Sequence, residues 1–152
     1  MVVVPLVMSI AACNDNPGAF KGSITTGPTV PLAVTLTPSL IGLTSLPGFN
    51  CPAFSGAFNV VIVASTSDLN MSAATFRLID GTTVGGPSVT IPTDNLTNSF
   101  GSTLILAGTS RSFAMHPVFG CSGLHPQQLT ADIVVTDRQG TSHTLSATAS
   151  VR

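Results

Sequence analysis

Residues 131–152 read ADIVVTDRQGTSHTLSATASVR and decide the fold class of this 152-residue chain. Apolar and polar residues alternate on both sides of Asp137-Arg138-Gln139-Gly140, a segment rich in turn-forming residues. Successive side chains of a strand point to opposite faces, so the pattern predicts two antiparallel strands, 129–135 and 142–151. The inward faces are expected to carry Leu129, Ala131, Ile133, Val135, Leu145, Ala147, Ala149 and Val151, and the outward faces Thr136, Thr144, Ser146 and Thr148.

The same alternation extends upstream, in short runs separated by Gly, Pro, Asn, Asp and Ser, and no long helical periodicity interrupts it. Asp80-Gly81 is a hairpin signal, and 94–100 is either one helical turn or an extended edge. Val60, Ile62, Phe76 and Leu78 are expected in the core, with Thr75 and Arg77 on the outer face. Further strands are predicted at 31–37, with 39–46 as a continuation past Pro38, and at 57–65, 73–79, 82–84, 88–91, 102–107 and 111–115.

Roughly seven to nine short strands with frequent turn signals are typical of a β-sandwich. The C-terminal hairpin resembles the last two strands of bacterial extracellular immunoglobulin-like and fibronectin-like domains. The resemblance implies an all-β fold, a single immunoglobulin-like antiparallel sandwich over residues 31–152. It departs from antibody-type domains because the chain contains no Trp and no Tyr, the residues that form their conserved core Trp and tyrosine corner.

Composition excludes several classes of protein. Charged residues make up only 7% of the chain, against roughly 25% in a typical soluble domain. A mean hydropathy of +0.50 and a net charge of -1 argue against disorder. Five Lys and Arg residues provide no basic patch for phosphates, so no nucleic-acid partner is expected.

The N-terminus carries a ten-residue apolar run, MVVVPLVMSI, which ends in Ile10-Ala11-Ala12-Cys13. An aliphatic residue, two small residues and a cysteine resemble the lipobox of bacterial lipoproteins, although no Lys or Arg precedes Lys21. The resemblance implies a signal segment over residues 1–12, lipidation of Cys13 and a flexible tether over residues 13–30. Another type of signal peptide, or a buried N-terminal strand, is the alternative.

If Cys13 carries the lipid, Cys51 and Cys121 remain as a pair among the three cysteines. Export would place them in an oxidising compartment, where paired cysteines form disulfides. We therefore expect a Cys51–Cys121 disulfide that staples loops at one pole of the sandwich, because both residues lie beside Gly and Pro at strand ends.

Candidate chemistry is sparse. His116, Cys121 and His125 could bind zinc with Cys51 as a fourth ligand, but their spacing fits no compact metal loop, and a disulfide would remove the thiolates. No G-x-S-x-G motif is present, so an enzyme is not expected. Arg77 is interpreted as a cross-strand partner for an Asp such as Asp132.

The leading hypothesis is an exported, lipid-anchored cell-envelope protein with a non-catalytic binding or spacer role. Its expected partners are the membrane, reached through the lipid, and a protein or glycan at the cell surface. The alternatives are a structural subunit of a surface assembly, or a metal-binding or enzymatic module around His116, Cys121 and His125.

Overall fold

The computed structural model of the chain describes residues 32–47, 52–80, 86–120 and 125–152, and β-strands dominate it. The predicted all-β class is confirmed. The elements in chain order are β1 (Ala33–Thr37), β2 (Leu40–Ile41), β3 (Leu43–Ser45), β4 (Phe54–Gly56), β5 (Phe58–Val63), β6 (Leu69–Ile79), β7 (Ser88–Pro92), α1 (Thr93–Phe100), β8 (Leu104–Ile105), β9 (Ser110–Met115), β10 (Val118–Phe119), β11 (Gln128–Asp137) and β12 (Ser142–Val151).

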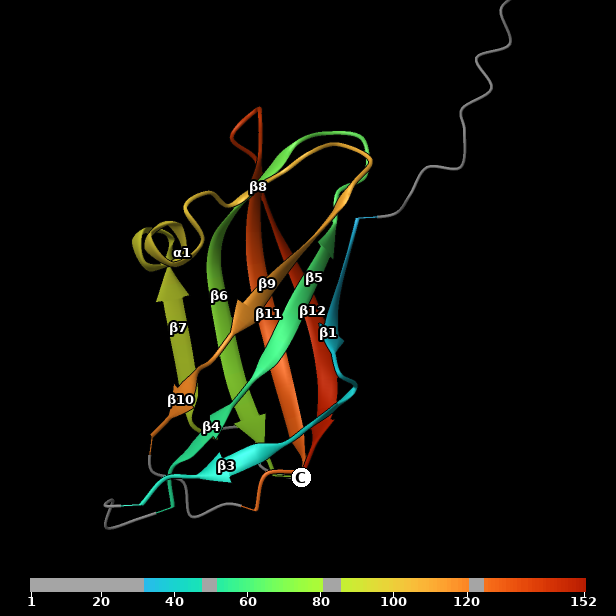
Figure 1. Ribbon diagram of the computed structural model, residues 1–152. Helices are drawn as coiled ribbons and strands as arrows, with labels where there is room; N and C mark the ends of the chain where they lie inside the picture. The colour runs from blue at the N-terminus through green and yellow to red at the C-terminus, as the bar shows by residue number, and fades with distance from the viewer. Residues whose placement is uncertain (1–31, 48–51, 81–85, 121–124) are drawn as a thin grey trace, which may run out of the picture.

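Two layers of strands pack face to face (Figure 1). The larger sheet has the order β2-β12-β11-β6-β7, with β8 paired to one end of β6. The smaller layer consists of β1-β5-β9 and of the short sheet β10-β4-β3. Figure 1 shows β4 leading into β5 and β10 following β9, so the two short sheets form one bent layer.

The C-terminal hairpin forms as its alternation predicts. β11 pairs antiparallel with β12 from Gln128↔Ser150 to Thr136↔Ser142, and with β6 on its other side. This central position buries one face of β11 completely, and Leu129, Ala131, Ile133 and Val135 are all 0% exposed.

The hydrophobic core lies between the two layers. Phe76 on β6 is fully buried and meets Phe58 on β5 edge-to-face, with ring centroids 5.1 Å apart. The predicted core residues Val60, Ile62 and Leu78 are also fully buried. Inter-sheet packing of this kind is the main favourable contribution to the stability of a sandwich.

Leu145 is the exception among the predicted core residues, because it is only half-buried. It lies in the middle of β12, whose outer edge is covered by β2 only at Ser150 and Val151. A side chain at an uncovered edge keeps part of its surface in solvent.

The chain between β6 and β9 differs most from the expectations. The ambiguous segment is a helix, α1, because Leu96 and Phe100 lie four residues apart on one face and both turn toward the core. Gly101 ends it with a φ of 69° and an N–H that donates to the Thr97 carbonyl at 2.8 Å. The strand expected over 102–107 shortens to β8. On the side of β6 away from β11, the paired strands are β7 and, at one end, β8. The return strand expected over 82–84 lies outside the described residues.

Substitutions of two adjacent residues on β6 test which face of this strand packs in the core. Phe76→Ala is expected to cost about 3–5 kcal/mol of unfolding free energy, because it removes a buried ring and leaves a cavity. Thr75→Ala is expected to cost under about 1 kcal/mol, since Thr75 lies on the outer face and only shares a hydrogen bond with Thr90. Denaturant unfolding measures both values, and equal losses would contradict the assigned faces.

Candidate functional site

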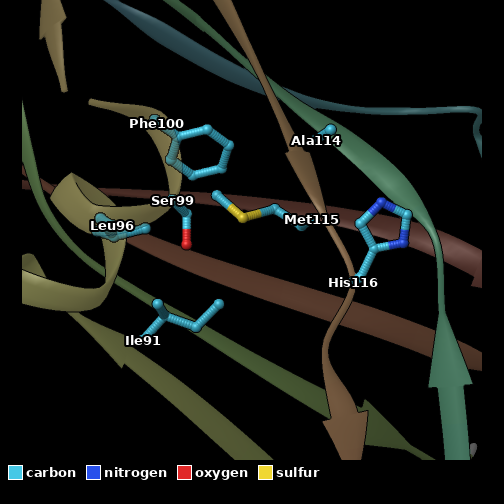
Figure 2. A pocket seen from close by; sticks show the side chains of 7 residues that line it. All are labelled: Ile91, Leu96, Ser99, Phe100, Ala114, Met115 and His116. Atoms are coloured by element: carbon cyan, nitrogen blue, oxygen red, sulfur yellow. The ribbon is translucent and has the colours of Figure 1, made fainter. Parts of the chain in front are cut away.

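A hollow of about 310 Å³ opens at one edge of the sandwich. It lies between α1 and the edge strands β7 and β9. Figure 2 shows the side chains that line it. β7 supplies Ile91; α1 supplies Leu96, Ser99 and Phe100; and β9 with the residue after it supplies Ala114, Met115 and His116.

The hollow exists because the two sheets are not closed along this edge. Among the described strands, β7 pairs only with β6 and β9 pairs only with β5. α1 bridges the gap at one end, where the Phe100 ring packs edge-to-face on Phe113 with centroids 5.2 Å apart. The Thr93 hydroxyl also donates to the Ser72 carbonyl, which ties the start of α1 to β6.

The lining is mainly apolar, with two polar groups at the rim. Leu96 and Met115 are buried and form the floor, whereas Ser99 and His116 are exposed. In Figure 2 the Met115 side chain lies between the Ser99 hydroxyl and the His116 imidazole. The hollow is at the lower end of the size range of ligand pockets. Its size and apolar lining suit a single apolar side chain or a small apolar group.

The zinc candidates are not brought together by the described structure. His116 lines the hollow, and His125 is exposed shortly before β11. Within the described ranges, no three His, Cys, Asp or Glu residues are placed to hold a metal ion. Cys121 lies outside the described residues, as do Cys13 and Cys51.

The predicted Arg77–Asp132 pair is wrong. The register sets Arg77 opposite Thr130, and Asp132 opposite Thr75. Asp132 accepts a hydrogen bond from the Ser146 hydroxyl on β12 at 2.6 Å, so its carboxylate is engaged on the side away from β6. Alternation alone gives the face of each side chain, but the offset between two strands depends on the pairing.

A polar cluster joins the loops at one pole of the sandwich. Asp68, after β5, accepts a hydrogen bond from the Ala107 backbone N–H at 2.8 Å and forms an ion pair with Arg138 in the β11–β12 turn. These contacts lower the pKa of the Asp68 carboxyl, mainly through the Ala107 N–H and to a lesser extent through Arg138.

The neighbouring Asp137 organises the turn itself. Its carboxylate accepts hydrogen bonds from the backbone N–H groups of Thr141 and Gln139 and lies 3.3 Å from the His143 imidazole. The Thr141 N–H is the largest cause of a lowered pKa at Asp137. Both carboxylates accept their bonds from groups of the same pole, so the cluster has a structural role in fixing that pole.

The described part of the chain contains no helix long and apolar enough to span a bilayer. No protein-family model matches the sequence, and no curated protein matches it.

Solved structures resemble the fold. A structural-genomics target designated SoR45 is similar with a TM-score of 0.50 at 9% identity, over 79% of this chain and 86% of that one. The Pseudomonas fluorescens alkylpurine DNA glycosylase AlkC bound to abasic-site DNA matches with a TM-score of 0.39 at 15% identity. That match covers 80% of this chain and only 30% of the glycosylase. At these identities the first structure shows the fold alone, and the second carries no argument.

The polar cluster predicts how stability depends on pH. The pKa of Asp68 is lower in the folded protein than in the unfolded chain, so its stabilising contribution is complete above the unfolded value, about 4. It is lost as the pH falls through the folded value. Asp68→Asn is expected to reduce stability at neutral pH and to flatten the decline in acid, as measured by thermal unfolding between pH 2 and 7.

Arg138→Met provides a graded comparison. It removes the ion pair but leaves the larger contribution of the Ala107 N–H in place, so its pH profile is expected to lie between those of the wild type and Asp68→Asn. An unchanged acid profile in Asp68→Asn would contradict the role assigned to this carboxylate.

Proposed function

We propose that this chain is an exported, lipid-anchored protein of the bacterial cell envelope whose β-sandwich has a non-catalytic binding or spacer role. The observation that carries the proposal is the sequence Ile10-Ala11-Ala12-Cys13, which resembles a lipidation signal and lies upstream of the sandwich. Residues 14–32 separate Cys13 from the first strand, β1, which begins at Ala33. This spacing supports a module held away from the membrane by a tether.

The direction of the strands supports the same arrangement. Ala33 pairs with Val63 at the end of β5, and Asp68 after that strand is bonded to Arg138 in the β11–β12 turn. β1 therefore starts at the pole that carries the polar cluster (Figure 1). A lipid on Cys13 would hold this pole toward the membrane.

The opposite pole would then be presented to the surroundings. The described residues that flank the connections β3–β4, β6–β7 and β10–β11 lie there, together with the C-terminus (Figure 1). Backbone hydrogen bonds join them: Gln127 N–H donates to Ile79, Val151 N–H to Gln127, and Leu43 N–H to Arg152. A protein or glycan partner at the cell surface would meet these connections or the apolar hollow beside α1.

An immunoglobulin-like form of the sandwich is part of the proposal. The chain passes between the layers at β1–β2, β2–β3, β5–β6, β8–β9 and β10–β11, and such crossings are typical of Greek-key sandwiches. This architecture serves many binding modules, but fold alone does not specify function.

A structural subunit of a surface assembly is the second candidate. The observation that favours it is the pair of sheet edges at β7 and β9, which have no further strand beside them among the described residues. Exposed edges accept an added strand through main-chain hydrogen bonds. A metal-binding or enzymatic module around His116, Cys121 and His125 has less support, since of the two described histidines only His116 lines the hollow.

A Cys51–Cys121 disulfide also belongs to the proposal. The antiparallel pairing of β4 with β10 places Phe54 opposite Phe119. Cys51 precedes Phe54 by three residues and Cys121 follows Phe119 by two. In antiparallel strands such residues continue from the same end of the pair, so the pairing supports a covalent link at this pole.

Lipidation is tested in the exporting cell with a fatty-acid analogue. The full-length chain is expected to incorporate the label and to sediment with membranes, whereas Cys13→Ala is expected to lose both. Cys51→Ala provides the matched control, because it removes a different cysteine and should leave labelling unchanged. An unlabelled wild-type chain in the soluble fraction would contradict the anchor.

The disulfide is tested by non-reducing peptide mapping of exported protein, which is expected to recover Cys51 and Cys121 in one linked peptide pair. Its loss in a Cys51→Ala, Cys121→Ala double variant is expected to cost about 2–4 kcal/mol of unfolding free energy, because the unfolded chain gains entropy. Recovery of both thiols free would contradict this pairing without bearing on the anchor.

A further inference from the structure

The outer face of the larger sheet carries mostly Ser and Thr in its two central rows, and Pro92, Ala73 and Val134 in the row beside them. It is the face turned away from β1, β5 and β9 (Figure 1). Four strands contribute to it, β7, β6, β11 and β12, in that order. Their cross-strand registers align the side chains in rows, of which the two central ones are Ser88–Arg77–Thr130–Thr148 and Thr90–Thr75–Asp132–Ser146.

The two rows differ in how their polar groups are satisfied. In the second row, the Thr75 and Thr90 hydroxyls share a hydrogen bond, and Ser146 donates to Asp132. In the first row, the Thr130 hydroxyl oxygen is buried without a hydrogen-bond partner. Arg77 forms no ion pair with the described acidic residues of its own chain, and its guanidinium is the cation of the two central rows.

Arg77 and Asp132 are thus one positive and one negative charge in two rows of side chains that are otherwise uncharged. They occupy adjacent strands and adjacent rows. An acidic partner would match Arg77 and face repulsion from Asp132, and a basic partner would do the reverse. The face therefore fits a partner that presents both signs at the same spacing.

We propose that this partner is a second copy of the chain, and that the two outer faces pack as a two-fold symmetric dimer. A two-fold axis lying in the interface and bisecting the line between the charges brings Arg77 of each copy over Asp132 of the other. The contact is isologous, so each complementary pair is formed twice. The short Ser and Thr side chains permit sheet-to-sheet approach at roughly 10 Å.

The size of the face sets the strength of the association. Four strands at about 4.8 Å spacing and about eight residues at about 3.3 Å rise cover roughly 500 Å². Stable interfaces bury roughly 800 Å² per partner, so the dimer is weak in dilute solution. Its two ion pairs lie near solvent, and added salt weakens them. Concentrating the chains on one surface strengthens such an association without any new contact.

Sedimentation velocity of the full-length chain tests the proposal by charge reversal. Dimer is expected to accumulate as the wild-type concentration rises toward about 1 mM at low salt, and to decrease in 1 M salt. Arg77→Asp and Asp132→Arg each bring like charges together across the two-fold axis. Each is expected to raise the concentration needed for dimerisation by at least about tenfold.

The double variant R77D/D132R restores opposite charges at both contacts and is expected to recover dimerisation to within about threefold of the wild type. Asp94→Arg, which changes the charge equally on exposed α1, is the control and should leave the association unchanged. Far-UV circular dichroism and thermal unfolding establish that each variant folds. The proposal is overturned by a wild type that stays monomeric, by single reversals without effect, or by a double variant that does not recover.

Discussion

The structure depends on the burial of one face of β6 and β11 against β5. Phe76 and Ile133 carry this contact from the larger sheet, and Phe58 and Val60 meet them from the smaller one. Two long antiparallel strands that alternate along most of their length present an apolar surface, which must be covered to stay out of water. The smaller layer provides that cover, and the remaining elements are attached around its edges.

The two open edges of the sandwich are covered differently. At β1 and β2 the chain moves from the smaller layer to the larger one, pairing with β5 and then with β12. Between β7 and β9 no strand makes this passage among the described residues, and α1 bridges the gap instead. An eight-residue helix cannot seal an edge as a strand does, because it blocks only part of the length. The apolar hollow and the free strand edges are two consequences of that one irregularity.

Several of the few charged side chains of the described structure lie at two places. Asp68, Asp137 and Arg138 fix the connections at the pole where β1 begins. Arg77 and Asp132 lie on the outer face, where Ser and Thr supply the rest of the polarity. Such surfaces carry little electrostatic penalty for approach of a like surface.

The sequence by itself determined the all-β class and the inward and outward faces of the long strands. It could do so because the two-residue period of a strand is a local property, visible wherever a run is long enough, as in residues 129–135 and 142–151. The inward assignments of Phe76, Leu78 and Ile133 agree with the structure for this reason. His116 was also singled out from the sequence, although as a metal ligand and not as part of an apolar hollow.

Only the tertiary structure decided which strands lie side by side. The offset that separates Arg77 from Asp132, the half-exposure of Leu145 and the helix at Leu96 all depend on neighbours distant in sequence. The hollow combines side chains from β7, α1 and β9, none of which carries a recognisable motif. Long-range pairing sets these features because each strand's partner is chosen by the burial of the whole core, which no short window of sequence contains.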